Sequence, residues 1–153
     1  MESIIISEPT FEKARKQILE NKDKKIVFTS DDDELNRKII EKIPVNILLI
    51  NQAGRKDFQK QRNSGFNQIL AKIAKKNNIT LGINLDEIIE SKEKTKAQIL
   101  ARVQQNIKLC NKNKLQMAFV SKKYKRNSYD LKALGSVLGM PTLMIKSLQT
   151  FFN

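Results

Sequence analysis

The hydrophobic and polar positions of this chain divide it into two kinds of segment. Short runs rich in Ile, Val and Leu, as expected for β-strands, occupy residues 4–6, 26–29, 45–50, 79–84 and 115–120. These runs are almost continuously apolar, which is typical of strands covered on both faces in a parallel sheet.

Between these runs, apolar residues recur every three or four positions, which predicts helices. The predicted helices cover residues 9–21, 31–43, a segment starting at 63 or 64, 93–111, 127–138 and 142–152. Alternating strands and helices indicate an α/β fold with right-handed crossovers and about five parallel strands. A length of 153 residues favours a single domain over residues 1–153.

Charge is spread unevenly along this chain. There are 29 Lys and Arg against 16 Asp and Glu, a net charge of +13. Residues 1–50 hold nine basic and ten acidic side chains, whereas residues 51–153 hold 20 basic and six acidic ones. A positive excess confined to one region favours nucleic acid as the partner, and the simpler alternative is a set of solvated helix faces.

Two predicted loops carry much of the excess, and both follow predicted strands. In a parallel sheet such loops share one edge, where ligands bind, so we expect the two to converge. Their predicted RNA-binding residues are Arg55, Lys56, Lys60 and Arg62 in the first loop, and Lys122, Lys123, Tyr124, Lys125 and Arg126 in the second. The aromatic rings of Phe58 and Tyr124 either stack on unpaired bases or pack against neighbouring loops.

The residue types that this chain lacks exclude several kinds of chemistry. It has no histidine and one cysteine, which rules out Ser-His-Asp and Cys-His catalysis, four-thiolate zinc sites and an intrachain disulfide. Cys110 falls on the apolar stripe of a predicted helix and is expected to be buried. We expect Asp31, Asp32, Asp33 and Glu34 to cap a helix, with Mg²⁺ binding as the alternative.

No apolar run approaches the roughly 18 residues that span a bilayer, and the first seven residues lack the pattern of an export signal. No glycine-rich phosphate-binding motif occurs either. We therefore expect a cytoplasmic protein with no membrane partner and no nucleotide-dependent chemistry, whereas carboxylate or lysine chemistry stays open.

Three stretches in the second part of the chain resemble one family. They are GRKD with SGFNQILAKIA at residues 54–57 and 64–74, ARVQQNIKLCNK at 101–112, and RNSYDLKALGSVLGM at 126–140. Their order and content are similar to those of the archaeal and eukaryotic ribonuclease P protein component 3 family. The matching family-motif residues are Arg55, Ser64, Gly65, Asn67, Arg102, Asn106, Lys108, Arg126 and Asp130.

The resemblance implies a TIM-barrel-like fold of the polymerase and histidinol phosphatase superfamily type. It also implies a subunit of the RNA-based endonuclease, a hydrolase, that removes the 5′ leader of precursor tRNA, with Mg²⁺ held on the RNA. The resemblance thus implies no catalytic residue, cofactor or metal in this chain itself. The implied partners are ribonuclease P RNA, at least one other protein subunit and, indirectly, precursor tRNA.

Two family positions differ in this chain: Gln68 replaces a histidine and Ser128 replaces a proline. The chain is also shorter than the family by about two N-terminal βα units, so we expect a truncated or open barrel. Two other functions stay open from the residues alone. One is a small metal-dependent phosphoesterase-like enzyme using Asp31–Asp33 or Asp57, and the other is a generic basic adaptor for rRNA or DNA.

Overall fold

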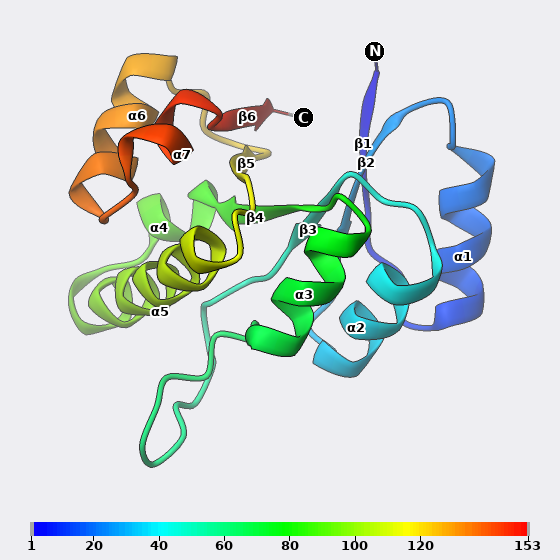
Figure 1. Ribbon diagram of the computed structural model, residues 1–153, viewed down its shortest axis with the longest axis horizontal. Helices are drawn as coiled ribbons and strands as arrows, with labels where there is room; N and C mark the ends of the chain where they lie inside the picture. Colours follow the sequence, from blue (N-terminus) through cyan, green and yellow to red (C-terminus); the bar gives the residue numbers. More distant parts are fainter. Residues whose placement is uncertain (1, 153) are drawn as a thin grey trace.

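The computed structural model describes residues 2–152 and contains one sheet of six parallel strands in chain order (Figure 1). The strands are β1 (Ser3–Ile6), β2 (Lys25–Thr29), β3 (Ile47–Leu49), β4 (Thr80–Asn84), β5 (Met117–Ser121) and β6 (Gln149–Phe152). Every neighbouring pair is parallel, so all six carboxyl ends lie along one edge of the sheet.

Helices connect the strands. They are α1 (Phe11–Glu20), α2 (Asp33–Lys42), α3 (Gln68–Lys76), α4 (Leu85–Glu90), α5 (Glu93–Lys112), α6 (Ser128–Val137) and α7 (Thr142–Lys146). Polar side chains cap several of them: the Asp32 carboxylate accepts the N–H groups of Glu34 and Leu35 at the start of α2. The prediction that the acidic run caps a helix is confirmed.

The sheet curls into an open half-barrel. Its inner face holds a small apolar cluster, made of Val27, Ile47, Leu49, Ala118, Val120 and Phe151 with Ile5 against it. Gly82 keeps this interior narrow, because a Cβ there would lie 3.0 Å from Cγ2 of Ile47. The Lys25 ammonium donates to Oε1 of Gln149 at 3.0 Å, joining β2 to the far edge strand. The predicted open, TIM-barrel-like α/β fold is confirmed, with one strand more than expected.

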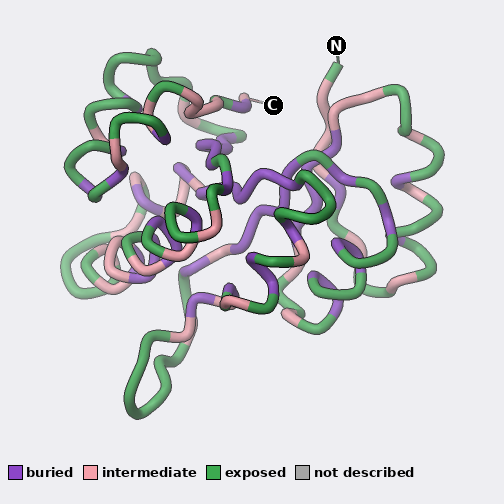
Figure 2. Tube along the Cα trace, in the orientation of Figure 1, coloured by how far each residue is buried: buried purple, intermediate pink, exposed green. Residues whose placement is uncertain are grey.

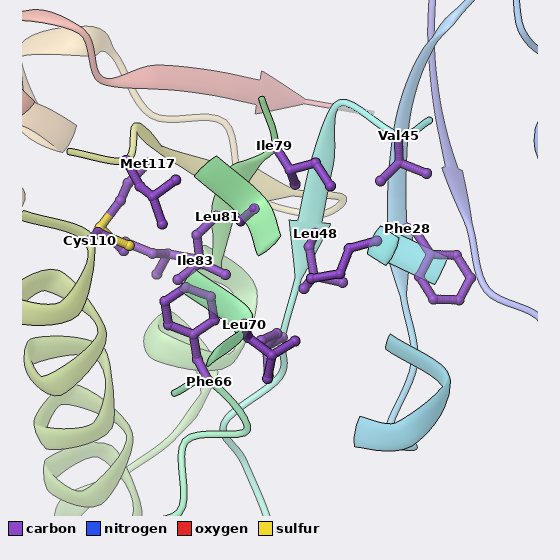
Figure 3. Packing of buried hydrophobic residues seen from close by; sticks show 14 of the residues in the cluster. Phe28, Val45, Leu48, Phe66, Leu70, Ile79, Leu81, Ile83, Cys110 and Met117 are labelled. Carbon is purple, nitrogen blue, oxygen red and sulfur yellow. The ribbon is translucent and has the colours of Figure 1, made fainter. Parts of the chain in front are cut away.

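The larger core lies between the outer face of the sheet and the helices. Figure 3 shows Phe66 and Leu70 packed near Leu81 and Ile83, with Cys110 beside Met117. Cys110 is fully buried, and burial raises the pKa of its thiol to about 12. The thiol is therefore a small core side chain, as predicted.

Two sequence expectations need correction, and one helix was missed. The last predicted helix stops at Lys146, and residues 149–152 form β6, because Phe151 fills the half-barrel interior while the backbone pairs with β5. The third helix begins at Gln68 rather than at 63 or 64, since Gly65 has a φ of +71° that a helix cannot include. The short helix α4 was not predicted.

Within residues 2–152, no helix combines the length and the apolar character needed to cross a membrane.

Candidate nucleic-acid interface

The short helix α4 lies between the two basic loops at the carboxyl edge of the sheet. It follows β4 directly, and β4 is flanked by β3 and β5, the strands that lead into the loops. Asn84 ends β4 and caps α4, and its amide also donates to Oδ1 of Asn51 at 2.9 Å. The base of the first loop is therefore joined to α4.

Two adjacent carboxylates of α4 each hold one loop. Glu87 accepts the backbone N–H groups of Gln52 at 2.7 Å and Ala53 at 3.1 Å. Asp86 accepts the Ser121 hydroxyl and the N–H of Lys122 at 2.9 Å. One turn of helix thus fixes the base of both basic loops, and the convergence of their exposed cations stays a prediction.

The pKa values of these two carboxyl groups are shifted in opposite directions. Burial raises the pKa of Glu87, and the N–H groups of Gln52 and Ala53 only partly offset it. Burial also opposes ionisation of Asp86, but hydrogen bonds from Ser121 and the backbone of Lys122 and Lys123 outweigh it, so the Asp86 pKa falls. The ionised form of Asp86 is the one that holds the second loop.

A buried arginine holds the first loop from the side. The guanidinium of Arg102, on α5, donates to the carbonyls of Gln52 at 2.9 Å and Arg55 at 2.8 Å, and to Oδ1 of Asp57 at 3.0 Å. The hydrogen bond from Arg102, followed by the Asn63 N–H, lowers the pKa of Asp57. Arg102 therefore shapes the loop from within.

Arg55 is also tied into the protein. Its guanidinium bonds both carboxylate oxygens of Asp33, at 2.8 and 3.0 Å, and the Asn51 carbonyl at 2.7 Å. Only 11% of the Arg55 side chain is exposed. Gly65 lies against this pair, because a Cβ there would come within 2.5 Å of Nη2 of Arg55. The charge of Arg55 is already paired with the Asp33 carboxylate, so its part in RNA binding stays a prediction.

The other predicted cations are exposed. Lys56 and Lys60 lie on a loop that extends away from the body of the molecule, and Figure 2 shows that this loop is exposed along most of its length. Arg62 contacts Asp57 at 3.2 Å with 46% of its side chain exposed. These exposed side chains can reach an external anion.

The second loop presents its cations differently. Lys122, Lys125 and Arg126 are exposed, and the Arg126 guanidinium lies 5.8 Å from the centre of the half-buried Tyr124 ring. Lys123 pairs with Glu90 at 2.9 Å, and this hydrogen bond raises the Lys123 pKa.

No model of a protein family matches this chain. A search of curated proteins finds ribonuclease P protein component 3 of Methanococcus vannielii, 26% identical over 92 residues. Among solved structures, a chain of an archaeal ribonuclease P with mature tRNA has a TM-score of 0.79, 24% identity and 95% coverage of this chain. The chain is a homologue of ribonuclease P protein component 3.

This chain spans only part of the length of the relatives that it matches. It covers 37% of the length of the Methanococcus protein and 62% of the archaeal ribonuclease P chain. A xylose isomerase domain protein from Planctomyces limnophilus has a TM-score of 0.50 at 11% identity, which shows the shared fold alone.

The residues of the ribonuclease P component 3 motifs mostly build the first loop and its surroundings. Ser64 is buried and bonds the Phe66 backbone, and the Asn67 side chain caps α3. Asn106 is buried one turn after Arg102, whereas Lys108 and Asp130 are exposed. The first two motifs thus mark a folded network around Arg102 and Gly65.

Sequence reasoning missed Asp86 and Glu87, which bring the two loops together. A signal was present: Asn84 followed by two acids is a common helix start. Among residues 2–152, no three or more His, Cys, Asp or Glu residues come together as a metal-binding group. In the acidic run, Asp32 caps α2 and Asp33 pairs with Arg55.

Proposed function

We propose that this chain is a protein subunit of ribonuclease P, the ribonucleoprotein that removes the 5′ leader of precursor tRNA. It binds and stabilises the catalytic RNA through a basic rim, which we define as Lys56, Lys60 and Arg62 of the first loop with Lys122, Lys123, Lys125 and Arg126 of the second. The homology to ribonuclease P protein component 3 supports the assignment of this chain to the ribonuclease P particle. The observation that carries the RNA-binding surface is the attachment of both loops to one turn of α4.

The rim suits phosphate groups rather than particular base sequences. Lys and Arg side chains neutralise phosphates and release counterions, so binding weakens as salt rises. If about five phosphates are neutralised, the slope of log K against log salt is about −4.5 on duplex RNA and shallower on single strands. This chain then positions the RNA, while hydrolysis and Mg²⁺ binding belong to the RNA.

The particle supplies the remaining partners. At least one other protein subunit and, through the RNA, precursor tRNA complete the proposed assembly. The solved archaeal ribonuclease P with mature tRNA is the context in which a chain of similar fold occurs.

Co-purification distinguishes this function from a generic nucleic-acid adaptor. The tagged chain is isolated from its own cells and the bound RNA is sequenced, with an untagged strain as the control. Enrichment of ribonuclease P RNA is expected. Recovery of ribosomal RNA or DNA without ribonuclease P RNA would contradict the assignment.

A further inference from the structure

A cleft of about 590 Å³ opens beside the first basic loop, between the start of α2, the start of α3 and α5. This volume falls within the range of ordinary ligand sites, roughly 300–1,000 Å³. Its walls are apolar where Phe66, Leu70 and Leu109 line it. The cleft lies outside the α4 turn that joins the two loops.

Amide side chains make up much of the polar wall: Gln61, Asn63, Asn67, Gln68 and Gln105. Some of these groups are already used, since Gln68 pairs with Asn113 and Gln105 donates to the Arg62 carbonyl. In the part of the chain that the structure describes, the side chains of Gln61 and Asn63 make no hydrogen bond. A carboxamide both donates and accepts, as the edge of a nucleobase requires.

The charges around the cleft cancel. Its lining contains two carboxylates and two guanidinium groups, from Asp33, Glu34, Arg37 and Arg62. A cleft with balanced charge favours a neutral, planar group over a free phosphate. An RNA base is such a group, because the negative charge of RNA lies on its phosphates and the base itself is neutral and planar.

One aromatic ring lines this cleft at the basic loop. Phe58 is 58% exposed, and it lies between the exposed cations Lys56 and Lys60 in the sequence of the loop. An exposed ring flanked by cations is an arrangement with which proteins bind single strands, stacking a base while neutralising phosphates on either side.

We propose that this cleft takes one unstacked base of a single-stranded RNA segment, stacked on Phe58 with its edge toward the free amides of Gln61 and Asn63. The inference rests on the proposed function, because the base belongs to bound RNA. It adds a preference for unpaired RNA that the cationic rim alone does not create.

The test compares two RNAs on the full chain at one salt concentration. Affinities for a single-stranded oligoribonucleotide and for a blunt RNA duplex of equal length are measured by fluorescence anisotropy. The variants are Phe58→Ala, Phe58→Trp and, as a control, Leu143→Ala, which truncates a side chain that is 79% exposed on α7. Circular dichroism checks that each variant is folded.

Phe58→Ala should weaken single-strand binding about 5- to 150-fold, the effect of losing one stacked base, and change duplex binding less than about twofold. Phe58→Trp should retain single-strand affinity, and Leu143→Ala should change neither. Equal loss on both RNAs, or no loss on either while the wild type binds them, overturns the base site and leaves the rim proposal standing. If the wild type binds neither RNA, the proposed function itself fails.

Discussion

The two basic loops flank the same strand, yet they use their charges differently. In the first loop, Arg55 is bonded to Asp33 and the loop is held by the buried Arg102. In the second loop, the backbone is held by Asp86 and the cations lie at the surface. A count of basic residues therefore overstates the charge that the first loop offers to RNA, and describes the second more faithfully.

The difference predicts that substitution of the buried Arg102 acts mainly on folding. Arg102→Ala removes a guanidinium that is 3% exposed and leaves two loop carbonyls without their donor. We expect a loss of about 2–3 kcal/mol in the free energy of unfolding, measured in urea. Arg37→Ala, which breaks an exposed pair with Glu41, should cost less than about 0.5 kcal/mol. Similar losses for both variants would contradict the buried role of Arg102.

Two glycines beside the first loop allow the cost of backbone strain to be measured separately from the cost of a steric clash. Gly54 and Gly65 both have positive φ, but only at Gly65 would a Cβ meet the Arg55 and Asp33 side chains. Gly54→Ala should cost about 1 kcal/mol from conformation alone, and Gly65→Ala at least about 1 kcal/mol more. Thermal or urea unfolding of both variants measures this gap. Equal costs would show that the pocket around the Arg55–Asp33 pair accommodates a methyl group.

The second loop should show a smaller, pH-dependent effect. Because the Asp86 pKa is lowered in the folded chain, its ionised form contributes stability above the ordinary value of 3.8. Asp86→Asn should therefore cost about 1 kcal/mol near pH 6. This difference from the wild type should shrink as pH falls below 3.8 through the folded pKa. Urea unfolding at pH 6 and pH 3 tests it, and a difference that grows toward acid would refute the role of ionised Asp86.

The strand pattern was readable because continuous Ile, Val and Leu runs have few alternatives in a chain of this size. β6 was not, since Gln149 to Phe152 continues a helical spacing from α7 and only the half-barrel interior selects the extended form. Boundaries set by glycine conformation, as at Gly65, likewise depend on tertiary contacts.

The location of the candidate site was predictable from the sequence, whereas the hydrogen bonds and ion pairs within it were less so. Parallel topology placed both loops at one edge, and exposure of Lys122 and Lys125 follows from a run in which Tyr124 is the one hydrophobic residue. The burial of Arg55 and Arg102 depends on partners distant in sequence, at Asp33 and Asp57. Charge pattern alone gives no means to distinguish these arginines from solvated ones.

The most direct test of the basic rim is the salt dependence of duplex RNA binding. Lys122→Gln with Lys125→Gln is compared with the wild type and with Lys13→Gln with Lys16→Gln, a matched pair of exposed lysines on α1. The rim pair should reduce the magnitude of the log K against log salt slope by about 1.8, from two lost phosphate contacts, and the α1 pair should leave it unchanged. Equal changes for the two pairs, or no change for either, would contradict RNA binding at the rim.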